Sequence, residues 1–160
     1  MALDRYDRTI LQCLQRNGRL SNRDLAEQVG LSAAPCWRRV KRLEEEGYIK
    51  DYIAQLNPRT LGLQLSAFAE VSLDNHHSAT LAAFNEMVDS CPQILECHSV
   101  SGQCDYFLKI VERDMASYES FLSGTLLQIK GIRSVSTMFS LRQSKLTREL
   151  PLGTANQSQS

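Results

Sequence analysis

The sequence has no excess of charge of either sign, because 18 lysines and arginines are balanced by 18 aspartates and glutamates. This balance argues against a generally basic protein that coats nucleic acid, so any nucleic-acid surface must be local. The chain also lacks a run of about 18 apolar residues, the length needed to span a membrane. Its first residues, MALDRYDR, lack the apolar stretch of a signal peptide. We therefore expect a cytoplasmic protein with no membrane partner.

Catalytic and metal-binding motifs are also missing. The five cysteines are odd in number and fit no paired zinc-ligand spacing, and neither a phosphate-binding loop nor a paired-carboxylate motif occurs. We expect reduced thiols, no metal, no cofactor and no enzymatic activity. One catalytic alternative takes Cys91, His98 and Asp105 as nucleophile, base and orienting group, but nothing in their spacing brings the three together.

The strongest local feature is the segment LSAAPCWRRVKRLEEEGYI, residues 31–49. Ser32 and Pro35 indicate the start of a helix, and Gly47 indicates its end. Within little more than one helical turn the segment places four cations, and three glutamates at 44–46 then reverse the charge. The four cations are Arg38, Arg39, Lys41 and Arg42.

Two further helices precede this segment. A helix over residues 4–17 begins at the capping residue Asp4, and a short helix begins at Ser21 and ends at Gly30. The short helix, a tight turn and the basic helix together have the proportions of a helix-turn-helix. Residues 48–56 then suggest a strand pair or wing. We expect a DNA-binding domain over residues 1–57.

The helical repeat predicts which residues of the basic helix face the other helices and which face outward. At 100° per residue, Cys36, Val40 and Leu43 point toward the other helices. Ala34, Arg38, Lys41 and Arg42 point roughly the opposite way, and Trp37 and Arg39 lie on the flanks. Small residues at the start of the helix would let it enter the major groove of double-stranded DNA. The alternative is a solvated amphipathic helix, with Trp37 as a packing residue. The expected DNA-binding set is Ser21, Arg23, Ser32, Ala33, Ala34, Trp37, Arg38, Lys41 and Arg42.

The second half of the chain has a different pattern. After a linker over residues 58–65, we expect strands at 66–73, 94–101, 106–111 and 132–141, and helices at 78–90 and 115–128. This β-α-β-β-α-β order is that of a ferredoxin-like domain, placed here at 66–145, and makes the fold class α+β. Two helices cover one sheet face, so homodimerisation is the simplest way to bury the other. Residues 146–160 are expected to form a disordered tail.

The order and spacing of several short motifs identify a family. Together they resemble the Lrp/AsnC transcription regulators, and the resemblance covers residues 3–145. Its Pro-Cys pair is similar to that of the leucine-responsive branch. The matching motifs are Leu3-Asp4, Asn17-Gly18-Arg19, Leu25-Ala26, Val29-Gly30-Leu31-Ser32, Pro35-Cys36, Arg42-Leu43-Glu44 and Gly102-Gln103-Cys104-Asp105-Tyr106.

This resemblance implies a winged helix-turn-helix joined to a ferredoxin-like (RAM/ACT-like) domain that binds a small amino-acid effector and assembles dimers, often into octamers. It implies that Gly102 allows close backbone approach and that Asp105 pairs with the effector's ammonium group or holds the turn. An effector-independent, architectural DNA-wrapping protein is the alternative, in which residues 102–106 are simply a hairpin connection. The implied effector residues are Gly102, Gln103, Cys104, Asp105, Tyr106, Met138 and Ser140.

Overall fold

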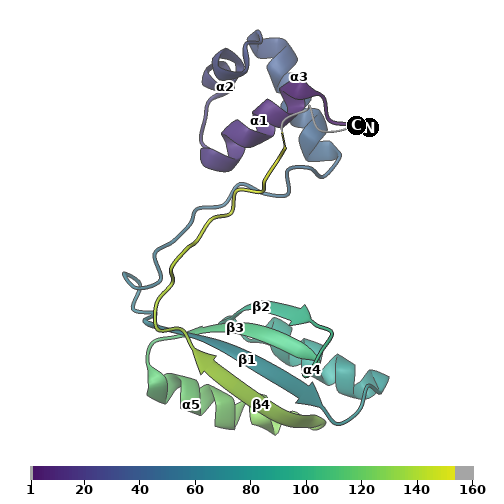
Figure 1. The fold of residues 1–160 in the computed structure, drawn as a ribbon, viewed down its shortest axis with the longest axis vertical. Helices are drawn as coiled ribbons and strands as arrows, with labels where there is room; N and C mark the ends of the chain where they lie inside the picture. Colours follow the sequence, from purple (N-terminus) through teal and green to yellow (C-terminus); the bar gives the residue numbers. More distant parts are fainter. Residues whose placement is uncertain (1, 154–160) are drawn as a thin grey trace. The chain divides into compact units, whose positions relative to one another are not determined.

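The structure is a computed structural model that describes residues 2–153. The chain divides into two units, Met1–Gln55 with Lys145–Ser160 and Leu56–Ser144 (Figure 1). Among the described residues, no helix is long and apolar enough to cross a membrane. The elements are α1 (Arg5–Arg16), α2 (Asn22–Val29), α3 (Ala33–Glu45), β1 (Leu65–Leu73), α4 (Ser78–Ser90), β2 (Ile94–Ser99), β3 (Tyr106–Glu112), α5 (Met115–Gly124), a 3₁₀ turn (Leu126–Gln128) and β4 (Ile132–Phe139).

The N-terminal unit is a three-helix bundle whose helix starts agree with the capping signals in the sequence. Asp4 and Asp7 form a reciprocal capping box at α1, in which each carboxylate accepts from the backbone N–H of the other residue. The Ser21 hydroxyl accepts from the Asp24 N–H at the start of α2. The helices bury one apolar cluster, centred on Ile10, Leu11, Leu25, Ala26, Val29, Cys36 and Leu43.

The turn between α2 and α3 is fixed by the backbone. Gly30 adopts a left-handed conformation with φ 73° and ψ 38°, which glycine reaches without steric cost. The following N–H of Leu31 then donates to the Ala26 carbonyl at 2.9 Å, closing the helix end. The Asn22 side-chain amide donates to the Ala33 carbonyl at 2.9 Å and joins the start of α2 to the start of α3. These bonds fix the helix-turn-helix geometry.

The predicted wing is absent among the described residues, because the segment between α3 and β1 contains turns but no strand. Its apolar residues Ile53 and Leu56 are exposed, with no strand of the same chain to pair with them. At residues 57–63 the chain makes a turn instead, in which the Leu63 N–H donates to the Pro58 carbonyl at 2.9 Å. Alternating apolar residues form a strand only where a partner strand completes the ladder, so the strand pair predicted at residues 48–56 does not form within the described part of the chain.

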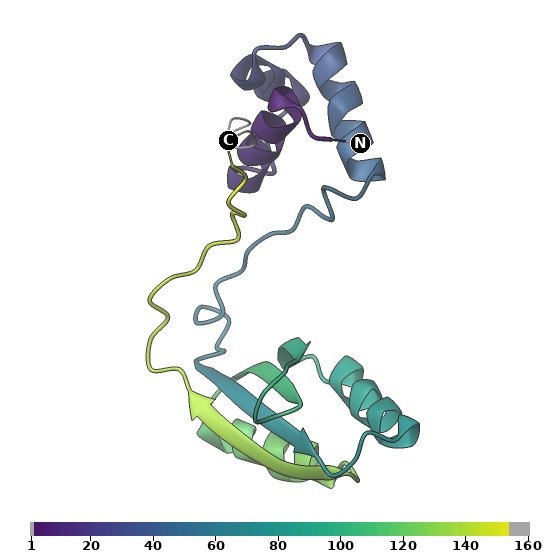
Figure 2. The ribbon, with the colours of Figure 1, turned by 45° about the vertical axis from the view of Figure 1, so that its right-hand side comes forward.

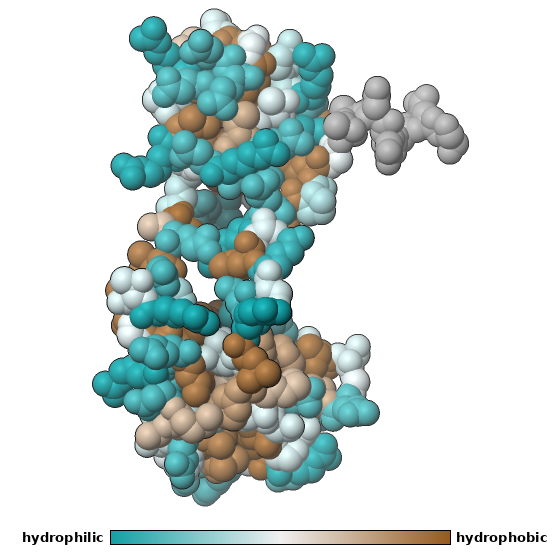
Figure 3. Space-filling view, turned by 60° about the vertical axis from the view of Figure 1, so that its left-hand side comes forward, coloured by the Kyte–Doolittle hydropathy of each residue, from teal (hydrophilic) through white to brown (hydrophobic). Residues whose placement is uncertain are grey.

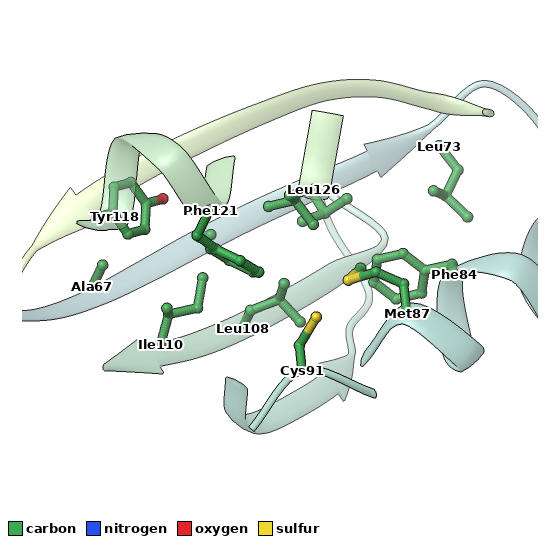
Figure 4. Packing of buried hydrophobic residues seen from close by; sticks show 12 residues of the cluster. Ala67, Leu73, Phe84, Met87, Cys91, Leu108, Ile110, Tyr118, Phe121 and Leu126 are labelled. Atoms are coloured by element: carbon green, nitrogen blue, oxygen red, sulfur yellow. The ribbon is translucent and has the colours of Figure 1, made fainter. Parts of the chain in front are cut away.

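The C-terminal unit is a four-stranded antiparallel sheet in the order β2-β3-β1-β4, as expected for the ferredoxin-like pattern. Helices α4 and α5 pack on one face (Figures 1 and 2). Figure 4 shows buried residues of that core, Phe84 among them. The Phe84 ring also packs against the ring of Tyr106, with the two centroids 4.3 Å apart. The Tyr118 hydroxyl is 2.6 Å from the Thr137 hydroxyl. Helix α5 is shorter than predicted, since it ends at Gly124 and a 3₁₀ turn follows.

Within residues 2–153, no helix covers the other face of the sheet. The rings of Phe68 and Phe107 stack there with their centroids 5.6 Å apart, and Met138 pairs with Phe68 across β1 and β4. Lys109 donates to Glu96 at 2.7 Å on the same face. In the view of Figure 3, apolar residues gather on the C-terminal unit with hydrophilic residues around them. An apolar sheet face of this kind usually marks an interface.

Candidate DNA-binding and effector sites

Two cations of α3 point away from the N-terminal bundle. Arg38 is exposed and makes no ion pair within the part of the chain that the structure describes. Lys41 is half-exposed, and its ammonium group is 3.1 Å from Glu44 one turn further along the helix. An exposed pair of this kind contributes little and breaks easily. Both side chains are therefore accessible from solvent.

The other two cations of α3 point inward, to α1. The Asp7 carboxylate, 1% exposed, lies 2.8 Å from Arg39 and 2.6 Å from Arg42. Arg39 also contacts Asp4 at 2.6 Å. Arg42 was predicted to point outward with Arg38 and Lys41. This orientation was wrong, because the buried Asp7 carboxylate attracts the Arg42 guanidinium inward.

These ion pairs shift the pKa of Arg39 and the pKa of Asp4. Hydrogen bonds from Arg39 to Asp7 and Asp4 raise the pKa of the Arg39 guanidinium. Burial opposes ionisation of Asp4, but the N–H of Asp7 and the Arg39 guanidinium outweigh it and hold the Asp4 pKa below its ordinary value. Carboxylates of the same unit therefore neutralise Arg39 and Arg42. The positive charge that α3 presents to solvent comes from Arg38 and Lys41.

The remaining predicted DNA-binding residues lie on one exposed surface at the starts of α2 and α3. The Ser21 hydroxyl is engaged with Asp24, to which it also donates at 2.7 Å. Ser32 has the backbone conformation of a helix cap, but its side chain makes no capping hydrogen bond, which leaves the hydroxyl available to a phosphate. The exposed members of the set are Ser21, Arg23, Ser32, Ala33, Ala34, Trp37, Arg38 and Lys41.

Trp37 is 53% exposed on α3. It borders a groove of about 220 Å³, together with Leu20, Lys41 and Tyr52. The Tyr52 hydroxyl donates to Glu44 at 3.1 Å, and burial together with this hydrogen bond raises the pKa of Tyr52 to about 12. A second cavity of about 360 Å³ lies beside Arg38, lined by Pro35, Arg39 and Arg42. Both hollows flank the outward side of α3.

Two residues that position α3 were not identified from the sequence. The role of Asp7 as the shared partner of Arg39 and Arg42 depends on packing between residues 32 or more positions apart. Its capping-box position three residues after Asp4 was the available signal. Asn22, which bonds to Ala33, carried no such signal beyond its place after the capping residue Ser21.

The predicted effector turn is built around Asp105. One carboxylate oxygen accepts from the Leu73 N–H at 2.7 Å, and the other is 2.8 Å from Nε2 of His76. The Leu73 hydrogen bond and His76 together lower the pKa of Asp105. The backbone of Asp105 also bonds in both directions, its N–H to Val71 and its carbonyl to Val100, each at 3.0 Å. The turn is therefore fixed by hydrogen bonds from both the carboxylate and the backbone of Asp105. The contact of His76 with Asp105 was not predicted from the sequence.

The seven predicted effector residues do not meet within one chain. Residues 102–106 form one group, in which Gly102 has φ 142°. Tyr106 pairs with Val71, whereas Met138 pairs with Phe68 and the Ser140 N–H bonds to Ser66. At about 3.3 Å per residue along β1, Met138 and Ser140 lie toward the opposite end of the sheet from the turn.

The catalytic alternative is not assembled by the fold. Cys91 is buried in the core of the C-terminal unit, whereas His98 contacts Glu96 at 3.4 Å and Asp105 contacts His76. Within residues 2–153, no group of three histidine, cysteine, aspartate or glutamate residues has a metal-binding arrangement. His98 and Asp105 thus each contact a different residue, Glu96 and His76 respectively.

Comparison with known proteins settles the family. A sequence profile of winged helix-turn-helix DNA-binding domains matches residues 3–50, and a profile of the Lrp/AsnC ligand binding domain matches residues 66–150. The chain belongs to the Lrp/AsnC family. Its relatives in this family include the Bkd operon transcriptional regulator of Pseudomonas aeruginosa, 43% identical over 94% of this chain and 98% of the relative. The leucine-responsive regulatory protein of Escherichia coli is 41% identical over 95% of this chain and 93% of the relative.

Solved structures agree with this assignment. A transcriptional regulator of Neisseria meningitidis, in complex with L-Met, superimposes with a TM-score of 0.91 at 39% identity, covering 94% of this chain and 97% of that one. An AsnC family regulator of Agrobacterium tumefaciens gives a TM-score of 0.88 at 39% identity, with the same coverage. The predicted α+β fold and the Lrp/AsnC resemblance are confirmed, and the chain is a DNA-binding transcriptional regulator of this family.

Proposed function

We propose that the outward side of α3 makes the main DNA contacts of this regulator, with Arg38 and Lys41 as the principal cations. The observation that carries this proposal is the division of the four α3 cations. Arg39 and Arg42 are paired with Asp7, while Arg38 and Lys41 are exposed and make no ion pair with α1 among the described residues. The small residues Ala33 and Ala34 let the start of α3 approach base edges in the major groove.

A gel-shift titration of the double variant Arg38→Ala/Lys41→Ala tests this assignment. We expect its DNA affinity to fall at least tenfold, because each contact made by a charged side chain contributes about 1.5–3 kcal/mol. Arg19→Ala removes an exposed cation from the same unit outside α3 and should leave affinity within about twofold. Equal affinities for the wild type and the double variant would show that α3 has been assigned wrongly.

We propose further that the effector is a small amino acid bound at the Asp105 turn. An ionised carboxylate offers about four lone-pair positions, of which Leu73 and His76 occupy two, so an ammonium group can be accepted as well. The Neisseria regulator, solved with L-Met, supports this ligand class. Met138 and Ser140 would come from another copy, since a single chain keeps them away from the turn.

Thermal shifts against the twenty amino acids test the effector proposal. A ligand at 100 times its dissociation constant stabilises the folded state by about 2.7 kcal/mol, and Asp105→Asn should abolish that shift. His77→Asn, at a neighbouring exposed position, is the matched control and should retain it. Stabilisation by none of the twenty would favour the effector-independent, architectural alternative.

We also propose that the open sheet face is the dimer interface, covered by a second copy, and that dimers assemble further into an octamer. The stacked Phe68 and Phe107 rings supply the apolar surface, and two copies would present paired α3 helices to half-sites about one DNA turn apart. Light scattering tests this proposal: the wild type should be dimeric or larger, and Phe68→Glu should be a monomer. A monomeric wild type would overturn it.

A further inference from the structure

The segment Glu149–Leu152 lies against α1, in the part of the chain that was expected to be a disordered tail. The Gln15 side chain holds Leu150 at both backbone groups, accepting from its N–H at 2.6 Å and donating to its carbonyl at 3.3 Å. Gln12 donates to the Leu152 carbonyl at 3.1 Å. Arg16 lies 3.3 Å from the Glu149 carboxylate. Residues 154–160 of the predicted tail lie outside the described residues.

Most of these contacts bind the peptide backbone of the segment and not its side chains. Gln12, Gln15 and Arg16 line one side of α1, and three of their four bonds go to the backbone of the segment. The Leu152 side chain packs against the apolar cluster of the N-terminal unit. Lys145–Ser160 consequently belongs to the same compact unit as Met1–Gln55.

The DNA-binding unit is thus connected to the rest of the chain at two points. It leaves the unit after Gln55, builds the C-terminal unit over Leu56–Ser144, and returns at Lys145. We propose that docking of residues 149–152 on α1 is a second anchor, which restricts the movement of the DNA-binding unit relative to the unit that assembles copies. This proposal identifies the Gln12–Gln15–Arg16 side of α1 as a receptor for the chain's own C-terminal segment.

The change in DNA affinity that a second anchor causes can be estimated from the statistics of flexible chains. For two comparable flexible connections acting in parallel, the mean-square displacement is about half that for one, so the accessible volume is about threefold smaller. The effective concentration of a second DNA-binding unit at its half-site rises by the same factor of about three. This consequence rests on the proposed function, whereas the docking itself does not.

Hydrogen exchange measured by mass spectrometry on the full chain tests the docking. In the wild type, exchange in peptides covering residues 147–153 should be slowed about tenfold for the amides of Leu150 and Leu152, which both donate hydrogen bonds. Gln15→Ala should return them to the rate of an unstructured peptide, and Gln28→Ala, an exposed glutamine on α2, should not. Exchange in the wild type at the unstructured rate would overturn the proposal.

The consequence for DNA is tested with duplexes that carry one or two half-sites. Gln15→Ala should weaken binding to two half-sites about threefold and leave binding to one half-site unchanged, and Gln28→Ala should change neither. An equal loss on both duplexes would mean that Gln15 acts on DNA directly, which contradicts an anchoring role. A wild-type chain that binds neither duplex would overturn the proposed function, while hydrogen exchange would still decide the docking.

Discussion

Replacement of Asp7 by asparagine removes the charge that ties α3 to α1. Asp7 is 1% exposed and contacts both Arg39 and Arg42 through charge-assisted hydrogen bonds of 2.8 and 2.6 Å. It also accepts from the Asp4 N–H in the capping box at 3.1 Å. Asparagine has nearly the same shape but carries no charge and a single acceptor oxygen, so the two arginines lose their shared partner without a cavity being formed.

The cost can be worked out from these contacts. A hydrogen bond to a charged group contributes about 1.5–3 kcal/mol, and two are weakened. Arg39 and Arg42 are 27% and 33% exposed, so water recovers part of the loss, and Arg39 keeps Asp4. We therefore expect the free energy of unfolding of the N-terminal unit to fall by about 2–4 kcal/mol. That is a large share of the roughly 5–15 kcal/mol typical of a domain.

Urea unfolding followed by tryptophan fluorescence measures this change in one unit selectively, because Trp37 on α3 is the single tryptophan of the sequence. With a slope of about 1.5 kcal/mol per molar urea, the midpoint should shift by roughly 1.5–2.5 M. The matched control is Asp24→Asn, which changes an exposed carboxylate on α2 that accepts from the Ser21 hydroxyl, and its shift should be less than half as large. Equal shifts for the two variants would refute the account of Asp7 as the shared buried partner.

Two further changes concern the C-terminal unit. Gly131→Ala should lower the thermal midpoint of this unit by several degrees, since Gly131 has φ 98° and a Cβ there would lie 2.5 Å from the Thr80 methyl group. Gly124→Ala is the control, because a Cβ at Gly124 meets no such contact, and it should leave the midpoint unchanged. Differential scanning calorimetry compares the two variants. Asp105 has a pKa lowered chiefly by the Leu73 N–H, so its contribution is present above the unfolded pKa near 4 and is lost as the pH falls through the lower folded value. Asp105→Asn should therefore flatten the acid side of a stability-against-pH curve, and an unchanged curve would contradict the assignment.

Local signals in the sequence were sufficient for most of the fold. Asp4, Ser21 and Gly30 mark helix ends through hydrogen bonds to residues within five positions, so their effect is visible in the sequence itself. The four strands follow from alternation of apolar residues, which tracks the buried face directly. Those elements were predicted to within about two residues at most ends.

Features set by distant residues were not predictable in this way. A helical projection places Arg42 beside Lys41, but the long Arg42 side chain turns to Asp7, 35 positions away. His76 meets Asp105 only because β1 and β3 pair. The polar composition of the tail suggested disorder, whereas Gln15 captures backbone groups, which composition does not reveal.

The salt dependence of DNA affinity tests the central claim, that the outward cations of α3 contact DNA while the inward ones hold the unit together. Each phosphate contact contributes about −0.9 to the slope of log affinity against log salt. For a dimer, Arg38→Ala should therefore make the slope less negative by about 1.8, with unfolding by urea unchanged. An unchanged slope in Arg38→Ala would contradict the claim directly.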